Sequence, residues 1–554
     1  MSTARNLIRK CHFSTVAKRA VLTTAIAAGI GSFMRSSARA DDWPMWGRTP
    51  LRDMVSPDKN PPTDWNVKTG ENVLWSAALG SKSYGNPVIS NGMVFVGTNN
   101  EGQRDPSNPA DAGVLMAFDA NTGKFLWQRI SAKLPTGRVN DWPGEGECAT
   151  VYTEPGRLWY CTNRCEVVCL DLSPGAQPEA GKPPKEIWSF DMINKLGVFP
   201  HNMTSCAIAS YGDYVYVITA NGVDDTHKHV VAPLAPSIVC FNKNTGQVKW
   251  TDNSPGVNVL HGQWASPAIV EVNGHHEVIA PLGDAWVYSY EAETGKILWK
   301  FDMNPKNAVY PQTRNEVIAT PCIVDQGDGK KYMYIANGQD PEHGEGLGHL
   351  YCVDITKEGD ISKELDVEPE QPKGSIGNGP VDIRGEARKG KPNPNSGIVW
   401  EYEQFDLNHD GKIDRSEHMN RTISTCLISP AGLCYAPDFS GFLHCLDAKT
   451  GKVQWTFDME SEVWGSPLWA DGKVYLADED GDIRIFEDSR EMKKVSPEDD
   501  HLNLGSASYC SPVFVNGILY VSDRDTLYAI KAGAKSAPKT DSGDKPEKPA
   551  KDDK

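Results

Sequence analysis

Residues 117–127 read Ala-Phe-Asp-Ala-Asn-Thr-Gly-Lys-Phe-Leu-Trp, and this pattern returns, with substitutions, along most of the chain. Three further copies are residues 240–250, 289–299 and 445–455. Each copy predicts a strand, a turn made by Asp or Asn and by Thr-Gly, and a second strand that ends in Trp. Glycine supplies the positive φ that a hairpin turn requires. The flanking alternation of apolar and polar residues is typical of half-buried strands, not of helices.

The residues before each copy add two more short strands. Before Ala117 come the apolar residues 87–89, a turn at Asn91-Gly92 and the apolar residues 93–96. A repeated unit of about four short strands joined by tight turns is typical of a propeller blade. We expect eight blades, whose first strands begin near Pro87, Thr150, Cys206, Pro267, Pro321, Cys426, Pro467 and Pro512.

The last unit stops after its third strand, residues 527–530, and has no fourth strand with a Trp. Residues 72–77, ahead of the first blade, have the character of that missing strand and contain Trp75. We therefore predict an all-β, eight-bladed β-propeller of four-stranded antiparallel blades. Its N-terminal strand would complete the last blade and close the ring, which protects otherwise open sheet edges.

The pattern Ala-x-Asp-x-x-Thr-Gly-x-x-x-Trp resembles the tryptophan-docking repeat of the pyrroloquinoline-quinone (PQQ) type eight-bladed propellers, and the resemblance covers residues 72–531. It implies that each Trp packs between neighbouring blades. The matching positions are Trp75, Trp127, Trp188, Trp250, Trp299, Trp400 and Trp455. The seventh blade departs from the pattern, because residues 485–492 contain neither Thr-Gly nor Trp.

Residues 1–40 have the pattern of a secretory signal peptide. Basic residues precede an apolar run at residues 20–30, and residues 38–40 (Ala-Arg-Ala) offer a small-x-small cleavage site. The run is short for a membrane span, and a retained amphipathic anchor is the alternative. We expect an exported protein, periplasmic or extracellular, in which residues 41–71 form an N-terminal extension of the ring.

The chain is acidic, with 56 Lys and Arg against 73 Asp and Glu and a formal net charge of −17. Residues 1–40 hold seven basic residues and no acidic one, so their removal leaves a net charge of −24. Such a surface argues against nucleic acid and anionic membranes as main partners. We expect a monomer without a transmembrane segment.

Thirteen cysteines in an exported chain could form disulfides, but their positions argue against most pairings. Four of them share a repeat position that other blades fill with Ala or Ser: Cys169, Cys240, Cys352 and Cys445. Such a position is small and buried, and a free cysteine there behaves as a small apolar residue. Equivalent positions on different blades should lie too far apart to bridge. A disulfide between Cys148 and Cys165 remains open.

The sharpest chemical motif is residues 406–417, Asp-Leu-Asn-His-Asp-Gly-Lys-Ile-Asp-Arg-Ser-Glu, which matches the twelve-residue EF-hand calcium loop. Calcium takes six to eight oxygen ligands. The predicted donors are five side chains and the carbonyl of the lysine: Asp406, Asn408, Asp410, Lys412, Asp414 and Glu417. A strand, not a helix, is expected before the loop, which favours a structural calcium ion over a calcium sensor.

Three other segments interrupt the repeat. Residues 357–397 form a long polar insertion in blade five, which we expect to be a surface excursion. Residues 532–554 have the composition of a disordered tail. Residues 478–482 resemble a second calcium loop but lack its closing Glu, so they predict a charged hairpin turn.

The family resemblance implies two kinds of function. In quinoprotein dehydrogenases, PQQ lies over the ring axis with a calcium ion and an Asp abstracts the substrate proton. In non-catalytic relatives the same ring is an interaction platform. This chain has neither the vicinal Cys-Cys of the dehydrogenases nor a haem-binding Cys-x-x-Cys-His. No catalytic or cofactor-binding residue can be assigned from the sequence.

The connections from each outer strand to the next innermost strand should gather on one axial face. There they bring together Glu147, His201, Asn202, His261, Arg314, Glu316, Arg421, Glu462 and Trp464. This mixture could bind a calcium–quinone pair, or it could line the wet mouth of a channel. We predict an exported binding or scaffold protein that takes a protein or small-molecule ligand at this face. A PQQ-dependent dehydrogenase of alcohols or sugars is the alternative.

Overall fold

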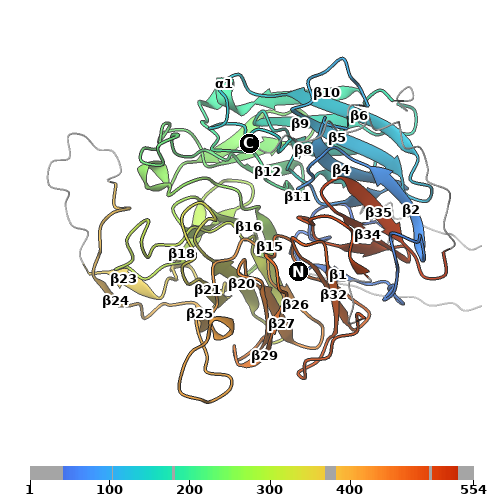
Figure 1. Cartoon of the computed structure of the whole chain (residues 1–554). Coiled ribbons are helices and arrows are strands. Elements are labelled where there is room, and N and C mark those ends of the chain that lie inside the picture. The colour runs from blue at the N-terminus through green and yellow to red at the C-terminus, as the bar shows by residue number, and fades with distance from the viewer. Residues whose placement is uncertain (1–41, 103, 177–180, 368–381, 498–501, 535–554) are drawn as a thin grey trace, which may run out of the picture. The chain divides into compact units, whose positions relative to one another are not determined.

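The computed structural model describes residues 42–102, 104–176, 181–367, 382–497 and 502–534, all within one compact unit, residues 38–554. The proposed signal peptide and nearly all of the tail lie outside the described residues. The unit is almost entirely β, with eight blades arranged around one axis (Figure 1). The predicted fold is confirmed. Among the described residues, no helix has both the length and the apolar character needed to cross a membrane.

The strands of each blade are numbered from the axis outward. Blade 1 is β3 (Val88–Ser90), β4 (Met93–Asn99), β5 (Ala112–Asp119) and β6 (Phe125–Ala132). Blade 2 is β7 (Tyr152–Glu154), β8 (Arg157–Cys161), β9 (Glu166–Asp171) and β10 (Glu186–Asp191). Blade 3 is β11 (Ala209–Tyr211), β12 (Tyr214–Ile218), β13 (Ile238–Asn242) and β14 (Val248–Asp252). Blade 4 is β15 (Ala268–Val272), β16 (His275–Pro281), β17 (Trp286–Glu291) and β18 (Ile297–Asp302).

The remaining blades follow the same order. Blade 5 is β19 (Cys322–Asp325), β20 (Lys331–Asn337), β21 (His349–Asp354) and β25 (Ile398–Tyr402). Blade 6 is β26 (Leu427–Ile428), β27 (Leu433–Pro437), β28 (Phe442–Asp447) and β29 (Val453–Asp458). Blade 7 has β30 (Leu468–Ala470), β31 (Lys473–Ala477) and β32 (Ile483–Glu487). Blade 8 is β33 (Val513–Val515), β34 (Ile518–Ser522), β35 (Thr526–Ile530) and β2 (Val73–Ala78). The described helices are short: α1 (Met192–Leu196) and two 3₁₀ turns, η1 (Gly256–Asn258) and η2 (Arg415–Glu417).

The N-terminal strand closes the ring as predicted. β2 pairs antiparallel with β35, and Trp75 lies opposite Ala529. Figure 1 shows the blue β2 beside the red β35. The Trp75 indole N–H donates to the carbonyl of Ala120 in blade 1 at 3.0 Å. One residue therefore joins the first and last blades of the chain.

Four of the seven predicted tryptophans dock on the glycine turns of the next blade, whereas Trp455 donates to the Ser489 carbonyl of blade 7 and Trp299 to Glu277 of its own blade. The indole N–H groups of the four donate to backbone carbonyls of those turns, in the pairs Trp75–Ala120, Trp188–Lys243, Trp250–Ala292 and Trp400–Ala448. A Cβ at Gly123 would lie 2.6 Å from the Trp75 ring, and Gly246, Gly295 and Gly451 crowd their tryptophans in the same way. The Thr-Gly of the repeat therefore serves two purposes, because glycine permits the positive φ of the turn and also makes room for the indole.

Blade 7 obtains its fourth strand in an unusual way. Among the described residues the outer side of β32 carries only a short antiparallel bridge, Phe486–Lys494, and no full fourth strand, in keeping with the missing Thr-Gly and Trp. Instead β1 (Val55–Ser56), from the N-terminal extension, pairs parallel with the innermost strand β30. The blade thus gains a strand at the axis rather than at the rim.

The N-terminal extension crosses the centre of the ring. Its residues 43–56 form hydrogen bonds with the innermost strands of blades 1, 2, 4, 5, 7 and 8. The fully buried Arg52 anchors the crossing: its guanidinium donates to the carbonyls of Trp46 at 2.7 Å, Ala207 at 3.0 Å and Pro267 at 2.9 Å. The last two acceptors hold the extension to blades 3 and 4.

All described cysteines are free and buried. Those of the shared repeat position lie opposite the docking tryptophans, as in the pairs Cys240–Trp250 and Cys445–Trp455. Their predicted role as small buried residues is confirmed. Cys148 and Cys165 are not joined: the Cys165 thiol lies 3.2 Å from the Thr219 carbonyl, and the Cys148 thiol lies near the carbonyl of Glu145.

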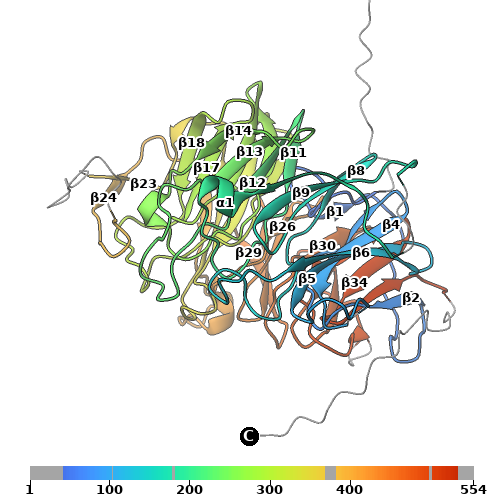
Figure 2. The same cartoon turned by 90° about the horizontal axis from the view of Figure 1, so that it is seen from above.

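The described parts of the polar insertion extend blade 4 at the rim. β22 (Gly359–Asp360) pairs parallel with β18, and β23 (Glu364–Asp366) pairs with β24 (Gly390–Pro392). Figures 1 and 2 both show this hairpin at the edge of the ring. Residues 478–482 form the turn between β31 and β32, as predicted.

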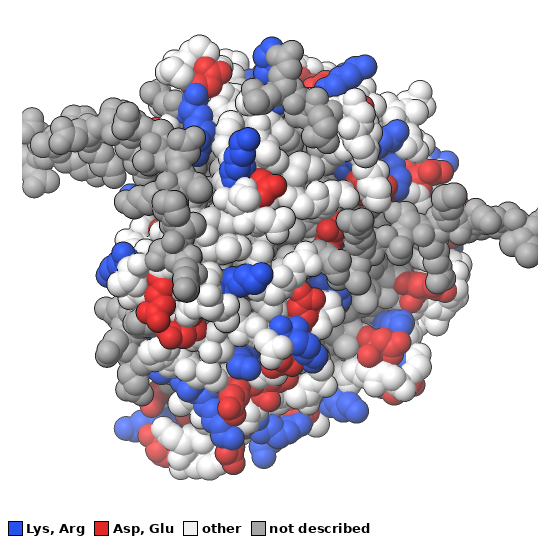
Figure 3. Space-filling model, turned by 90° about the vertical axis from the view of Figure 1, so that its right-hand side faces the viewer, with Lys and Arg blue, Asp and Glu red and all other residues white. Residues whose placement is uncertain are grey.

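The charged surface shown in Figure 3 is mixed: Lys and Arg side chains lie among Asp and Glu side chains rather than in a broad patch of one sign. The absence of a nucleic-acid partner and the monomeric state stay predictions.

Candidate functional site

The blades place two kinds of connection on one face of the ring. In an antiparallel four-stranded blade, the link from the outer strand to the next blade and the loop between the second and third strands emerge at the same end. We call this end the connection face, and the opposite end, with the tight turns at Asn91-Gly92 and Thr122-Gly123, the hairpin face.

A cavity of about 320 Å³ lies on the axis at the connection face. All eight inter-blade links contribute to its wall, so it occupies the centre of the ring. Trp46 of the N-terminal extension also lines it, and the Arg52 acceptor Ala207 belongs to the same wall. The extension therefore reaches the cavity through Trp46 and is anchored to its wall by Arg52.

Aromatic rings dominate one side of the cavity. Tyr84 stacks on Tyr509 with ring centroids 4.6 Å apart, and the edge of Trp464 packs against both rings. Trp264 lines the cavity from the link between blades 3 and 4, and its indole N–H donates to the His201 carbonyl at 3.1 Å. Aromatic rings that are held in place by stacking and hydrogen bonds present rigid, flat surfaces to a ligand.

The cavity is acidic. Glu145, Asp340 and Glu342 line it, and no Lys or Arg belongs to its described lining. Burial raises the pKa of Asp340 to about 7. Glu145 has one oxygen 2.9 Å from the Lys82 ammonium and a second, buried oxygen without a hydrogen-bond partner.

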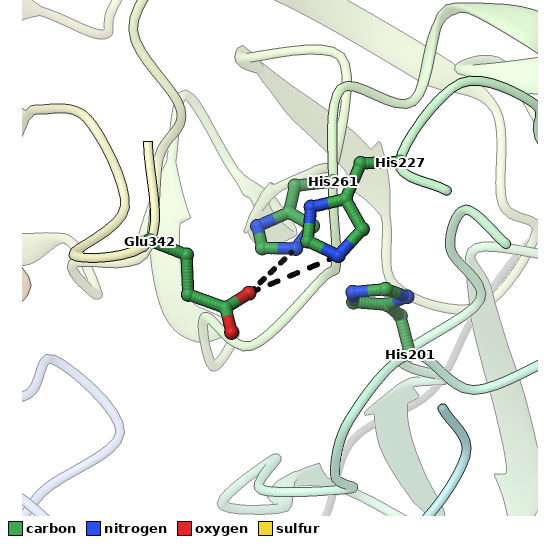
Figure 4. A group of neighbouring side chains, drawn as sticks. All are labelled: His201, His227, His261 and Glu342. Atoms are coloured by element: carbon green, nitrogen blue, oxygen red, sulfur yellow. Dashed lines mark ion pairs between the residues drawn. The ribbon is translucent and has the colours of Figure 1, made fainter. Parts of the chain in front are cut away.

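A cluster of histidines lies beside the cavity. His201 and His261 come from inter-blade links, and His227 and His343 come from loops between second and third strands. The ring centroid of His261 lies 4.4 Å from that of His201, 4.6 Å from that of His227 and 4.3 Å from that of His343. Figure 4 shows three of these rings and the Glu342 carboxylate around a common space.

The cluster holds uncharged imidazoles next to carboxylates. Burial lowers the pKa of His201 to about 4 and that of His261 further, so both are neutral at pH 7. Burial also opposes protonation of His343, but a 2.6 Å hydrogen bond to Glu316 outweighs it and raises that pKa. Glu342 Oε2 lies 3.5 Å from His261 Nε2 and 3.9 Å from His227 Nε2.

The axial residues predicted from the sequence divide into three groups. Two line the cavity: Asn202 and Trp464. Three join the histidine cluster: His201, His261 and Glu316. Four belong to neither: Glu147, Arg314, Arg421 and Glu462. Arg314, for example, pairs with the buried Asp302 at 3.0 Å and so serves the fold.

The sequence reasoning missed His227, Glu342 and His343. It considered only the links between blades, whereas these residues lie in the loops between β12 and β13 and between β20 and β21. Two features of the sequence indicate these loops. Both loops are much longer than the tight turns of the hairpin face, and both carry histidine near acidic residues, Asp224-Asp225 and Asp340-Pro-Glu342.

The predicted calcium loop follows the outer strand β25, and η2 (Arg415–Glu417) closes it, as expected from the sequence. Asp406 Oδ2 accepts from the Gly411 N–H at 3.0 Å, and Glu417 Oε1 accepts from the Leu407 N–H at 2.8 Å. The other oxygen of Asp406 is buried and has no hydrogen-bond partner. The loop is thus folded around its own carboxylates.

The sequence matches the family model described as outer membrane protein assembly factor BamB over residues 55–177, 183–343 and 404–534. The chain belongs to this PQQ-repeat family. The match spans most of the described ring, in agreement with the repeat pattern. None of the curated proteins compared with the sequence matches it.

Several solved structures share the fold. The quinohemoprotein alcohol dehydrogenase from Comamonas testosteroni is 16% identical, with a TM-score of 0.57 over 92% of this chain and 83% of that chain. A europium-containing methanol dehydrogenase is 14% identical, with a TM-score of 0.54 over 88% and 90%. BamB from Moraxella catarrhalis is 13% identical, with a TM-score of 0.48 over 83% and 99%. Identities this low extend the likeness to the fold alone.

The cavity lining by itself offers PQQ no cationic side chain among the described residues. PQQ is a tricarboxylate, and a buried anion needs cationic or N–H partners. The cavity instead presents the carboxylates of Glu145, Asp340 and Glu342, with no Lys or Arg in its described lining. PQQ without a bound cation is therefore disfavoured in this site.

Proposed function

We propose that the chain is an exported binding protein whose axial cavity takes a small, uncharged, hydroxyl-bearing ring compound, with a neutral sugar as the reference ligand. Export is supported by the pattern of residues 1–40. The observation that carries the proposal is the lining of the cavity, which combines aromatic rings and carboxylates without a Lys or Arg among the described residues.

The lining matches the chemistry of a sugar. The C–H face of a pyranose ring packs against flat aromatic rings such as Tyr84, Trp264 and Trp464, while its hydroxyl groups donate to the carboxylates that line the cavity, Glu145, Asp340 and Glu342. The volume of about 320 Å³ is at the lower end for small-molecule sites, so it suits one or two rings. Acidic sugars are disfavoured by the same carboxylates.

Replacement of Trp264 by Ala or of Glu145 by Gln is expected to weaken binding of a neutral disaccharide by about tenfold or more, because each removes a stacking face or a charged acceptor. Calorimetric titration of the purified protein with neutral and uronic disaccharides measures this. Trp286→Ala, a partly exposed indole in β17 outside the cavity lining, is the matched control and should bind as the unchanged protein does.

The same titration separates the competing functions. Uptake of PQQ with calcium, followed by reduction of a dye with alcohols or sugars, would replace this proposal with a quinoprotein dehydrogenase. A crosslinked protein partner that is lost in Trp264→Ala, with no disaccharide bound, would replace it with a protein scaffold. Binding of uronic and neutral disaccharides with equal affinity would contradict the charge argument.

We further propose that residues 406–417 bind a structural calcium ion. The loop has carboxylate or amide oxygens at alternate positions. One oxygen of Asp406 has no protein partner and is free to coordinate a calcium ion. The loop stands between blades 5 and 6, so the ion would stiffen that link. It would leave the axial cavity untouched.

Calcium at 100 times its dissociation constant should raise the unfolding free energy by about 2.7 kcal/mol, and Asp406→Ala combined with Glu417→Ala should abolish this gain. Thermal unfolding with and without calcium measures it. Asp480→Ala, in the acidic turn between β31 and β32, is the control and should keep the full calcium response. An unchanged response in the double variant would remove the assignment.

A further inference from the structure

We propose that the histidine cluster binds one divalent first-row transition-metal ion, with zinc as the reference ion. The donors are the Nε2 atoms of His201, His227 and His261 and a carboxylate oxygen of Glu342. One ligand atom from each of these residues lies within 4.8 Å of all the others. Donors about 2.0 Å from a tetrahedral ion lie about 3.3 Å apart, so small side-chain movements would complete the site.

The hydrogen bonds around the cluster leave the right nitrogens free. His201 Nδ1 lies 2.8 Å from the Val223 carbonyl, an acceptor only, so Nδ1 carries the proton and the lone pair is on Nε2. A metal-binding histidine ordinarily donates its other N–H to a carbonyl or carboxylate in this way. His201 Nε2 is buried and has no hydrogen-bond partner.

A chain of two histidines and a carboxylate orients His227. His343 Nδ1 donates to Glu316 Oε1 at 2.6 Å, and in the neutral form of His343 this leaves its Nε2 as an acceptor. His227 Nδ1 lies 3.2 Å from that nitrogen and donates to it, so the lone pair of His227 is on Nε2. That atom faces Glu342 Oε2 at 3.9 Å. Glu316 and His343 are therefore positioning residues for the site.

His261 is the strongest single pointer to a ligand. Its side chain is fully buried, and neither ring nitrogen has a hydrogen-bond partner. Burying unpartnered polar atoms is costly, and proteins rarely tolerate two on one ring. The nearest charged atoms are carboxylate oxygens at 3.5 and 3.8 Å. A metal ion between the imidazole and Glu342 would satisfy Nε2.

The donor set selects the class of ion. Three imidazoles and a carboxylate suit zinc, iron, copper or nickel, whereas calcium and magnesium prefer oxygen alone. The site is thus chemically distinct from the loop at residues 406–417. Glu342 also lines the axial cavity, whereas His227 lines a second hollow with Tyr310 and Arg384. The ion would sit between two openings, and solvent can reach it.

Zinc binding to the full-length mature protein tests the proposal without any sugar present. We expect one zinc ion per chain after exhaustive dialysis, counted by elemental analysis, and displacement by cobalt to give visible d–d absorption. Glu342→Gln and His227→Ala change the less buried ligands, so the variants should fold. Each is expected to weaken zinc binding by about 10- to 100-fold or more in competition with a chromophoric chelator.

His229→Ala is the matched control, because His229 lies two residues from His227 in the same loop, is mostly exposed and pairs only with Asp224. It should bind zinc like the unchanged protein. The Asp406→Ala, Glu417→Ala double variant should also keep its zinc. Absence of zinc or cobalt binding, or equal affinity in Glu342→Gln, His227→Ala and the unchanged protein, would overturn the site. The outcome is separate from that of the sugar titration.

Discussion

Trp75→Ala should lower the unfolding free energy by about 3–5 kcal/mol, the cost of removing a buried tryptophan. Trp75 is 3% exposed, lies opposite Ala529 in blade 8 and donates to the Ala120 carbonyl in blade 1. The substitution therefore leaves a cavity where the first and last blades of the chain meet, and it removes one of the two donors to the Ala120 carbonyl, the other being the Tyr520 hydroxyl at 3.1 Å. Urea unfolding followed by circular dichroism measures the loss.

A matched substitution separates the stability lost through ring opening from the stability lost by removing any indole. Trp286→Ala removes a partly exposed tryptophan that packs beside Tyr288 and two lysines within the region of blade 4. Its cost should stay near 1 kcal/mol. Equal, small losses in the two variants would show that the closing strand contributes little and would contradict the docking account.

Arg52→Ala is expected to cost about 3–5 kcal/mol, because it leaves three buried carbonyls without a donor and each unsatisfied group costs about 1–3 kcal/mol. These carbonyls belong to Trp46, Ala207 and Pro267. Burial lowers the pKa of Arg52 to about 10, so the side chain is still charged at neutral pH and removing it is a large change. The midpoint of urea unfolding reports the loss.

The same variant should also disturb the cavity, since Trp46 forms part of its wall. Arg48→Ala is the control: Arg48 is four residues away in the same extension, but it makes only a long ion pair of 4.0 Å with Asp53. It should cost less than 1 kcal/mol. If Arg52→Ala unfolds at the same urea concentration as Arg48→Ala, the extension is not anchored as described.

The repeat explains why so much of the fold was predictable. Each Thr-Gly turn needs a docking Trp in the blade before it, so the pattern fixes strand order, blade number and even the small position occupied by Ala529 or Cys445. Ring closure followed because one Trp-bearing strand was missing at one end of the repeat and left over at the other.

The features outside the repeat could not be predicted in the same way. The extension bonds to five different blades through its backbone groups, which leave no residue-specific pattern. Likewise, His227 and His343 are 116 positions apart in the sequence. They come into contact because the loops of blades 3 and 5 that carry them lie over the same part of the connection face. Contacts of this kind depend on the assembled ring rather than on local sequence.

The two ends of the described chain have an orientation that matters for any attachment. Asp42 contacts Ser90 beside the Asn91-Gly92 turn, and Lys531 bonds to the Asn72 carbonyl after β35, so both ends leave from the hairpin face. A lipid, a fusion partner or a sensor surface linked at either end would hold the protein by its hairpin face. The histidine cluster and the axial cavity would then face away from the attachment. Attachment through either end would therefore leave the axial cavity and the histidine cluster accessible to ligands.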